Sequence, residues 1–268
     1  MNEDYYKNVK EAFSLQSLDY DDYELLHSTL KYMRTEVRNH VMRYLRDGDR
    51  MLEINAGTGN DAVFFAKNGF RVHATDISGG MIYQLKNKVT KYKLDSHVSI
   101  QQCSFTELDK VTCGPFDYIF SNFGGLNCAP DLRQVTKFFP FLLNKKGRIT
   151  LVLMPPLCPW EIALIFRGHL KTAFRRLKKN GVKSHIEGKY FNTFYYTPRQ
   201  TINALDEKFR IIELQGLSSF TPPPYMSNFP EKFPSIFNSL KYLDKYFSKH
   251  FPFNSLADHF ILTAEYLP

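Results

Sequence analysis

The segment Leu52–Ala62, with the sequence LEINAGTGNDA, constrains the possible folds of this chain more than any other. A short apolar strand pattern ends in Glu53, a turn with two glycines follows, and a helical pattern opens directly after the turn. Gly57 and Gly59 permit backbone angles that a Cβ atom forbids, so a ligand can approach the main chain closely there. The segment therefore predicts a ligand-binding turn between a strand and a helix.

Strands and helices are predicted to alternate on both sides of this turn. Strand patterns at 50–55 and 70–76 enclose a short helix, which stops before Asn68 and Gly69. Further strands are predicted at 97–103, 116–121 and 148–154, with helices at 81–91 and 131–143. This alternation predicts an α/β fold with a Rossmann-like, mostly parallel sheet and helices on both faces.

One domain of 268 residues is expected, because a chain of this length can bury most of its apolar surface in a single core. Its expected parts are an N-terminal helical cap at 1–49, the ligand-binding core at 50–155, a basic helical insertion at 156–196, and C-terminal strands with a proline-rich aromatic cap at 197–268. Apolar residues at helical spacing predict one or two helices in the first part. The last part is predicted to contain a helix from Pro198 to about Lys208, strands at 209–217 and 260–266, and an irregular cap between those strands.

Composition excludes several classes of protein. Hydrophobic residues make up 43% of the chain, with 14 glycines and 14 prolines, which is typical of a globular protein and not of a disordered or collagenous one. The 4 cysteines form no CxxC pair, so neither a disulfide scaffold nor a metal site is expected. The apolar run at 149–166 is interrupted by prolines, and the start has no apolar signal segment, which predicts a soluble, cytoplasmic protein.

Two cofactors fit the glycine turn. The spacing from Gly57 to Ala62 satisfies the dinucleotide fingerprint GxGxxA, and Asp76, at the end of the next strand, can bind the ribose of either cofactor. Glu53 distinguishes them, because a carboxylate there repels a pyrophosphate but suits the ammonium group of an amino acid. S-adenosylmethionine (SAM) is therefore the preferred ligand, with an NAD(P)-dependent oxidoreductase as the alternative.

Four motifs in order resemble those of the class I SAM-dependent methyltransferases. Residues 53–59 are similar to the first motif, Asp/Glu-x-Gly-x-Gly-x-Gly, with Asn55 in place of its first glycine. ATDIS at 74–78, CSF at 103–105 and FDYIFSNFGGLN at 116–127 resemble the later motifs. The resemblance implies a Rossmann-like, seven-stranded methyltransferase sheet with an antiparallel last strand, a helical and aromatic cap, SAM as cofactor and S-adenosylhomocysteine (SAH) as product.

The resemblance also implies roles for the matched residues. The turn at 53–59 would wrap the methionine part of the cofactor, Asp76 would bind the ribose, residues 77 and 103–105 would flank the adenine, and residues 121–123 would lie beside the methyl group. Ser104 stands where many members have an aspartate for the adenine amino group, and its hydroxyl can accept the same hydrogen bond. The expected cofactor-binding residues are Glu53, Asn55, Ala56, Gly57, Gly59, Asp76, Ile77, Met81, Cys103, Ser104, Phe105, Ser121, Asn122 and Phe123.

The expected acceptor is a small hydrophobic or amphiphilic molecule, methylated on oxygen, nitrogen or carbon. The sequence SNFG at 121–124 lacks the paired prolines of enzymes that methylate nucleic-acid amines, so a nucleic-acid substrate is not expected. Aromatic residues at 15% of the chain favour a largely apolar pocket. Because positioning alone can support methyl transfer, no base is required. Tyr20 and His169 are the candidates for a catalytic residue, since both are predicted to face the cleft.

The segment 160–189 carries most of the formal net charge of +8. Its apolar residues recur at helical spacing, with basic residues on another face, which predicts an amphipathic basic helix. Such a helix fits a peripheral contact with an anionic membrane or an acidic partner, whereas a solvated face is the simpler interpretation. A SAM-binding module without catalysis, docked through this helix, is therefore a further alternative. The oligomeric state is left open.

Overall fold

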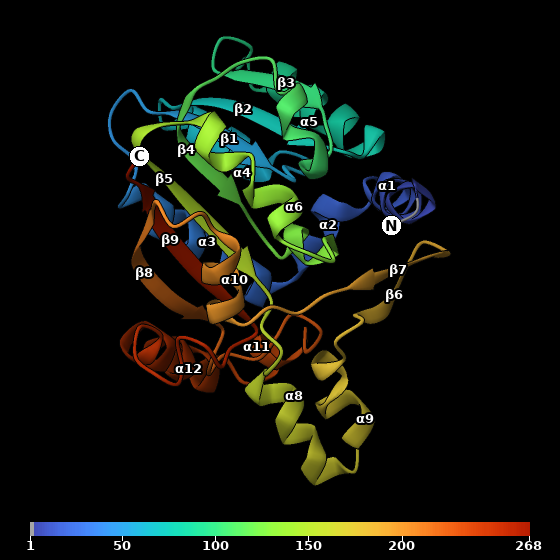
Figure 1. Cartoon of the computed structure of the whole chain (residues 1–268). Coiled ribbons are helices and arrows are strands. Elements are labelled where there is room, and N and C mark those ends of the chain that lie inside the picture. The colour runs from blue at the N-terminus through green and yellow to red at the C-terminus, as the bar shows by residue number, and fades with distance from the viewer. Residues whose placement is uncertain (1–2) are drawn as a thin grey trace.

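The structure is a computed structural model that describes residues 3–268, and a seven-stranded sheet runs through its middle (Figure 1). The strands of this sheet are β1 (Arg50–Ile54), β2 (Arg71–Asp76), β3 (Val98–Gln102), β4 (Phe116–Ser121), β5 (Leu143–Leu153), β8 (Phe209–Leu217) and β9 (His259–Tyr266), in the spatial order β3-β2-β1-β4-β5-β9-β8. The first five strands are parallel, and β9 lies antiparallel between β5 and β8. The predicted mostly parallel sheet with an antiparallel last strand is confirmed.

The sheet separates two apolar cores, because successive side chains of a strand point to opposite faces. On one face, Met51 of β1 packs with Val37 in the cluster that includes α3 (Ser28–Met42), α4 (Asn60–Lys67) and α5 (Gly79–Lys91). On the other face, Leu52 packs with Phe139 in the cluster that includes α6 (Arg133–Thr136), α7 (Phe139–Leu142) and the 3-10 helix η1 (Phe105–Lys110). Both faces of the sheet are therefore covered by helices, as predicted.

Three helices precede β1, where one or two were predicted: α1 (Glu3–Gln16), α2 (Tyr20–Leu26) and α3. The helix predicted at 131–143 is also divided, into α6 and α7, because Pro140 starts a new helical turn at the beginning of α7. The strand predicted from residue 148 begins at Leu143 instead. Among residues 3–268, no helix combines the length and the hydropathy that a bilayer-spanning segment needs.

The single amphipathic basic helix predicted within 160–189 is wrong. The chain forms four short helical pieces, α8 (Pro159–Ala163), η3 (Leu164–Arg167), α9 (Leu170–Ala173) and η4 (Arg175–Leu177), and then a hairpin of β6 (Val182–Ile186) and β7 (Lys189–Thr193). Gly168 breaks the helical path with a φ of 78°. The hairpin turn at Glu187 and Gly188 has positive φ at both residues, which matches the twist of two paired strands. The expected helical insertion at 156–196 is therefore partly strand.

The C-terminal part keeps its predicted strands but not its irregular cap. Helix α10 (Pro198–Ala204) begins with a capping box between Thr197 and Gln200, and it ends before the predicted Lys208. The segment between β8 and β9 contains the short α11 (Phe229–Lys232) and the 14-residue α12 (Pro234–Phe247). Pro234 is compatible with this helix because it occupies the first turn, where no backbone donor is needed.

Candidate functional site

A cavity of about 230 Å³ lies at the carboxyl ends of β1, β2 and β4. In parallel sheets, ligands bind at this edge where the strand order reverses, here between β1 and β4. The loops after these strands form the floor of the cavity, while α1, α2 and the β6–β7 hairpin contribute its other walls. Among the predicted site residues, those that line it are Tyr20, Asn55, Gly57, Asp76, Ile77, Met81, Phe105, Asn122 and Phe123.

The remaining predicted residues lie beside or behind this cavity. Cys103 and Ser104 line a neighbouring groove, which shares Ile77 with the cavity. Four of the expected cofactor-binding residues line neither the cavity nor this groove: Glu53, Ala56, Gly59 and Ser121. Ser121 accepts a hydrogen bond from the Asn55 side chain at 3.2 Å and so acts on the site through its neighbour.

The turn after β1 depends on left-handed backbone at Asn55, Gly57 and Gly59, with φ of 58°, 56° and 81°. A Cβ at Gly59 would lie 2.0 Å from Leu85 Cδ1, so a side chain there would displace Leu85 and would also strain the left-handed backbone. Asn55 tolerates its left-handed angles better than most residues do. Its side chain fills the space beside Gly125, where an added Cβ would lie 2.7 Å from Asn55 Cβ.

Asp76 ends β2 with its carboxylate toward the glycine turn. The backbone N–H of Gly57 donates to Asp76 Oδ2 at 2.9 Å, and the N–H of Ser78 donates to Oδ1 at 2.8 Å. Burial raises the pKa of Asp76 to about 6, although these two hydrogen bonds lower it in part. The carboxylate therefore connects the turn to α5 while remaining part of the cavity wall.

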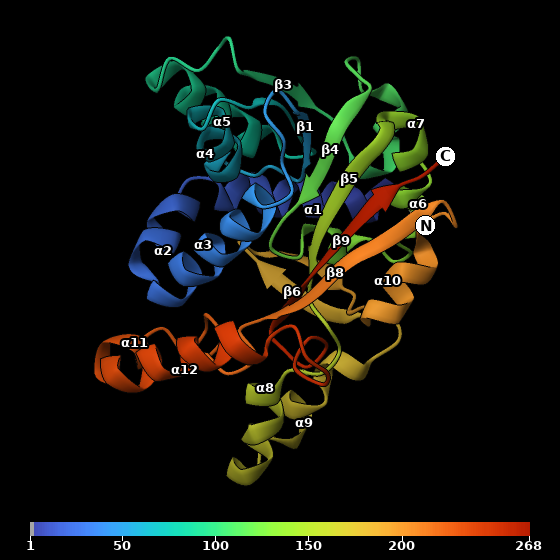
Figure 2. The same ribbon diagram turned by 90° about the vertical axis from the view of Figure 1, so that its left-hand side faces the viewer.

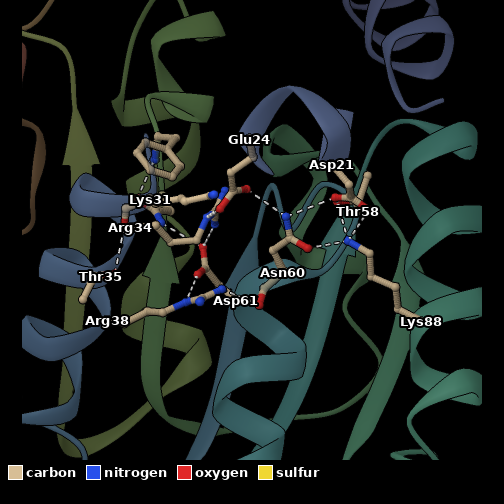
Figure 3. Close-up of polar contacts among 12 residues, drawn as sticks. Asp21, Glu24, Lys31, Arg34, Thr35, Arg38, Thr58, Asn60, Asp61 and Lys88 are labelled. Carbon is tan, nitrogen blue, oxygen red and sulfur yellow. Dashed lines mark hydrogen bonds and ion pairs between the residues drawn. The ribbon is translucent and has the colours of Figure 1, made fainter. Parts of the chain in front are cut away.

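A network of buried charges holds the loop after β4 in place, as Figure 3 shows in part. Asp61, at the start of α4, binds Arg34 directly, accepts from Arg38 Nε at 2.7 Å, and accepts from the Asn122 side chain at 2.8 Å. Burial alone would raise the pKa of Asp61, but Arg34 and Arg38 hold it below its usual value. The Arg34 guanidinium also lies 4.5 Å from the ring centre of Phe123. The network thus fixes both Asn122 and Phe123 at the cavity.

The outer part of the same network ties α2 to the glycine turn (Figure 3). Asp21 accepts from Thr58 Oγ1 at 2.7 Å and from the Asn60 side chain at 3.1 Å. Lys88 Nζ lies 2.6 Å from Asp21 Oδ2, and Asn60 also donates to Glu24 at 2.8 Å. Helix α2 is therefore anchored against the start of α4.

Glu53 is buried beneath the turn. Its Oε2 has no hydrogen-bond partner among residues 3–268. Burial and the nearby Asp61 raise the pKa of Glu53, despite the opposing charges of Arg34 and Arg38. The carboxylate does not line the cavity.

The two candidate catalytic residues have different outcomes. Tyr20 lines the cavity, and burial raises the pKa of its phenol, which therefore keeps its proton. His169 is exposed at the start of α9 and does not line the cavity, so the prediction that it faces the cleft is wrong. The turn at Gly168 ends η3 just before His169 and changes the direction of the chain there.

The sequence does not predict the residues of α1 and of the β6–β7 hairpin that complete the cavity wall. Val9 and Phe13 of α1 and Phe191 and Thr193 of β7 all line the cavity, and the ring centres of Phe13 and Phe191 lie 5.7 Å apart. The two elements are joined by an ion pair of 2.5 Å between Glu11 and Lys189. The Tyr5 hydroxyl, which has one proton to donate, lies 2.8 Å from the carbonyl oxygen of Cys128 and 2.7 Å from that of Asn192. No local signal identifies these residues, because the contacts join segments far apart in the sequence.

Among residues 3–268, one group of side chains has the spacing of metal ligands: Cys158, Glu161 and Asp258, whose ligand atoms lie within 4.8 Å of one another. The guanidinium of Arg176 lies among them, 2.9 Å from Glu161 Oε1 and 2.7 Å from Asp258 Oδ1. Arg175 donates two further hydrogen bonds to Glu161. The positive charge that a metal ion would bring is therefore already supplied by arginine.

The core of the chain is similar to known methyltransferases. Residues 51–147 match the model of a methyltransferase domain. No curated protein sequence matches this chain. Among solved structures, a 1,6-didemethyltoxoflavin-N1-methyltransferase of Burkholderia thailandensis, with bound substrate and SAH, is similar with a TM-score of 0.60 at 16% identity, over 99% of this chain and 90% of that chain.

Two further structures share the fold at lower similarity. A Listeria monocytogenes protein, described as a SAM-dependent methyltransferase, has a TM-score of 0.57 at 14% identity, over 86% of this chain and 96% of that one. The [4+2]-cyclase SpnF has a TM-score of 0.56 at 13% identity, over 87% of this chain and 80% of that one. At these identities the likeness concerns the fold, which hosts more than one reaction, so the site residues must decide the chemistry.

Proposed function

We propose that this chain is a class I SAM-dependent methyltransferase and that it methylates a small, uncharged and largely apolar acceptor. The observation that carries the proposal is the lining of the cavity. One end presents the Asp76 carboxylate, and the other walls are apolar or neutral. Among the lining residues that the structure describes, Asp76 is the only one with a formal charge at neutral pH. A charged acceptor would therefore lose its hydration without gaining a partner.

The residues around the glycine turn fit SAM, which supplies a methyl group made electrophilic by its sulfonium. Asp76 has oxygens available to accept hydrogen bonds from ribose hydroxyls, and Ile77 and Phe105 offer apolar surface to an adenine. Gly57 brings bare backbone to the cavity wall. The unpartnered oxygen of Glu53 fits a nearby ammonium group, because a positive charge offsets the burial that raises its pKa.

The acceptor side of the cavity contains hydrogen-bonding groups but no base. Tyr20 keeps its proton and can donate, while Ser184 and Thr193, whose hydroxyls lie 2.7 Å apart, can donate or accept. No lysine, histidine or glutamate lines the cavity within residues 3–268. We therefore favour an acceptor whose lone pair needs no deprotonation, such as a neutral amine or ring nitrogen. The similar Burkholderia enzyme is named for methylation at N1 of a small molecule, which supports this class.

Helix α1 and the β6–β7 hairpin are proposed to act as the cover of the site. The cavity of about 230 Å³ is smaller than the roughly 300–1,000 Å³ of typical ligand pockets. In this proposal the Glu11–Lys189 ion pair and the hydrogen bonds of Tyr5 open to admit cofactor and acceptor. Once closed, the cover excludes water and holds the acceptor near the methyl group, which is the main requirement of this displacement.

Turnover with a chemically sorted panel tests the proposal. SAM with a labelled methyl group is offered with neutral heteroaromatic amines, with phenols and with carboxylates of similar size. Label should enter the neutral amines, at a rate that is constant above about pH 7 because no protein base titrates. Label transferred only to phenols, at a rate that rises with pH, would contradict the acceptor class. Binding of SAH without transfer to any extract or panel member would instead favour the non-catalytic module.

Cofactor affinity is expected to depend on pH through Asp76. Burial raises the pKa of this carboxyl to about 6, and ribose hydroxyls bind the ionised form. The affinity for SAH should therefore be constant above about pH 7 and fall as the pH drops below 6, by up to about tenfold per pH unit. Titration calorimetry between pH 5 and 8 measures this profile. Asp76→Asn should remove the dependence, and a wild-type profile that stays flat would contradict the assignment.

A further inference from the structure

The segment 159–180, here called the basic arm, exposes apolar side chains that a soluble surface rarely carries together. The exposed fractions are 94% for Phe166, 57% for Leu170, 45% for Phe174 and 49% for Leu177. Figures 1 and 2 show that α8 and α9 extend away from the sheet and do not pack on it. Exposed apolar side chains gathered on one projecting segment favour an interaction site.

The charge on the same arm has one sign. Arg167, Lys171, Lys178 and Lys179 are all exposed. The one acidic residue of the arm, Glu161, is buried and is bound by Arg175 and Arg176. The arm therefore presents aromatic and aliphatic side chains among free positive charges, with no exposed negative charge between them.

Buried contacts hold the arm on the body of the protein. Arg176 donates to the side chain of Asp258 at 2.7 Å and to its carbonyl at 3.0 Å. The Trp160 indole donates to the carbonyl of Phe220 at 2.9 Å. These hydrogen bonds join the arm to the loops before β9 and after β8. The arm is therefore anchored to the rest of the protein.

We propose that the basic arm docks this protein on the surface of an anionic lipid bilayer. Lysine and arginine are attracted to anionic headgroups, and phenylalanine and leucine gain by entering the acyl boundary. A second copy of this chain is a poorer occupant, because it would bring the same positive charges face to face. A nucleic acid would satisfy the charges but leave the leucines exposed to polar surroundings.

The basic arm is joined at both of its ends to chain that lines the cavity. The arm begins just after Met154 and ends just before Ser184, and both of these residues line the cavity. A lipid surface that binds the arm is therefore connected to the site through the two chain segments that flank the arm.

Vesicle sedimentation with the full chain tests the docking surface. The probes are vesicles of phosphatidylcholine alone and of phosphatidylcholine with phosphatidylglycerol, without cofactor or acceptor, so the result does not depend on the proposed methyl transfer. The chain should sediment with the anionic vesicles and should be released by salt. Lys171→Glu with Lys178→Glu should lower the partition coefficient more than tenfold, since each basic residue contributes about fivefold. Phe166→Ser with Phe174→Ser should lower it about tenfold.

Matched controls come from the opposite edge of the sheet. Phe141 of α7 is 84% exposed, and Lys145 lies near the amino end of β5. Phe141→Ser and Lys145→Glu should leave vesicle binding unchanged. All of these side chains are exposed, so the variants should fold, which a melting curve checks.

Three outcomes would overturn the proposal. The first is equal binding to both kinds of vesicle, or no binding to either. The second is a dimer, seen by sedimentation equilibrium, that Phe166→Ser dissociates, since a second copy would then be the occupant. The third is tighter binding to single-stranded RNA than to anionic vesicles, with loss of both in the lysine variants.

Discussion

Asp76→Asn is expected to weaken SAH binding about 100-fold or more. The carboxylate already accepts hydrogen bonds from the N–H groups of Gly57 and Ser78, and its remaining lone pairs would accept two ribose hydroxyls. Asparagine keeps the size of the side chain but offers only one oxygen as an acceptor. Its NH2 group would face one of the two backbone N–H groups, and two donors cannot form a hydrogen bond. Because hydrogen bonds to charged groups contribute about 1.5–3 kcal/mol each, losing two of them accounts for the change. Titration calorimetry at pH 7.5 measures the dissociation constant.

Asp95→Asn is the control for this variant, because Asp95 is an exposed aspartate of the loop before β3. It removes the same charge from the protein but should leave the SAH affinity unchanged. A melting curve of Asp76→Asn without ligand separates lost binding from lost folding. If that variant binds SAH as tightly as the wild type while it remains folded, the ribose does not lie at Asp76.

Arg176→Met is expected to lower the free energy of unfolding by about 3 to 5 kcal/mol, which is the usual cost of leaving buried carboxylates without their partner. Glu161 and Asp258 are both buried, and burial alone would raise the pKa of each. Arg176, with help from Arg175 and His259, instead holds the pKa of both carboxyls below the usual range. Methionine fills a similar volume without the charge. Urea unfolding at pH 7 measures the loss.

The loss in Arg176→Met should be smaller at pH 5, because the stranded carboxylates can then take up protons in the folded state. Arg167→Met is the matched control in the same arm. Arg167 is exposed and forms no ion pair among residues 3–268, so its replacement should change stability by no more than about 0.5 kcal/mol. Equal effects of the two variants would mean that the buried cluster does not stabilise the fold.

The sheet was predictable because each of its strands has a local pattern. The strand predicted at 209–217 is β8 with the same bounds, and the other strands differ mainly at their ends. The hairpin at 182–193 was missed, since the turn at Glu187 and Gly188 is a weaker signal than Asn-Gly and the basic residues suggested a helix. Helix α12 was missed for a similar reason. Its neighbouring prolines indicated irregular chain, although Pro234 only starts the helix.

The site also contains residues that local motifs predict and residues that they do not. Gly57, Asp76 and Phe123 follow or end parallel strands, so the order of the motifs along the chain is enough to place them at one edge of the sheet. Arg34 and Phe191 come from the N-terminal cap and the hairpin, and their positions depend on tertiary packing. Periodicity tells which face of a helix is apolar, but not which distant strand that face will meet.

Asn55 and Gly125 are not independent positions. The side chain that replaces the usual glycine at 55 fills the space that any side chain at 125 would need. A relative with glycine at 55 is free to accept alanine at 125, whereas this chain is not. The two positions are therefore expected to covary among relatives, and an engineer who restores the family residue at one gains a new choice at the other.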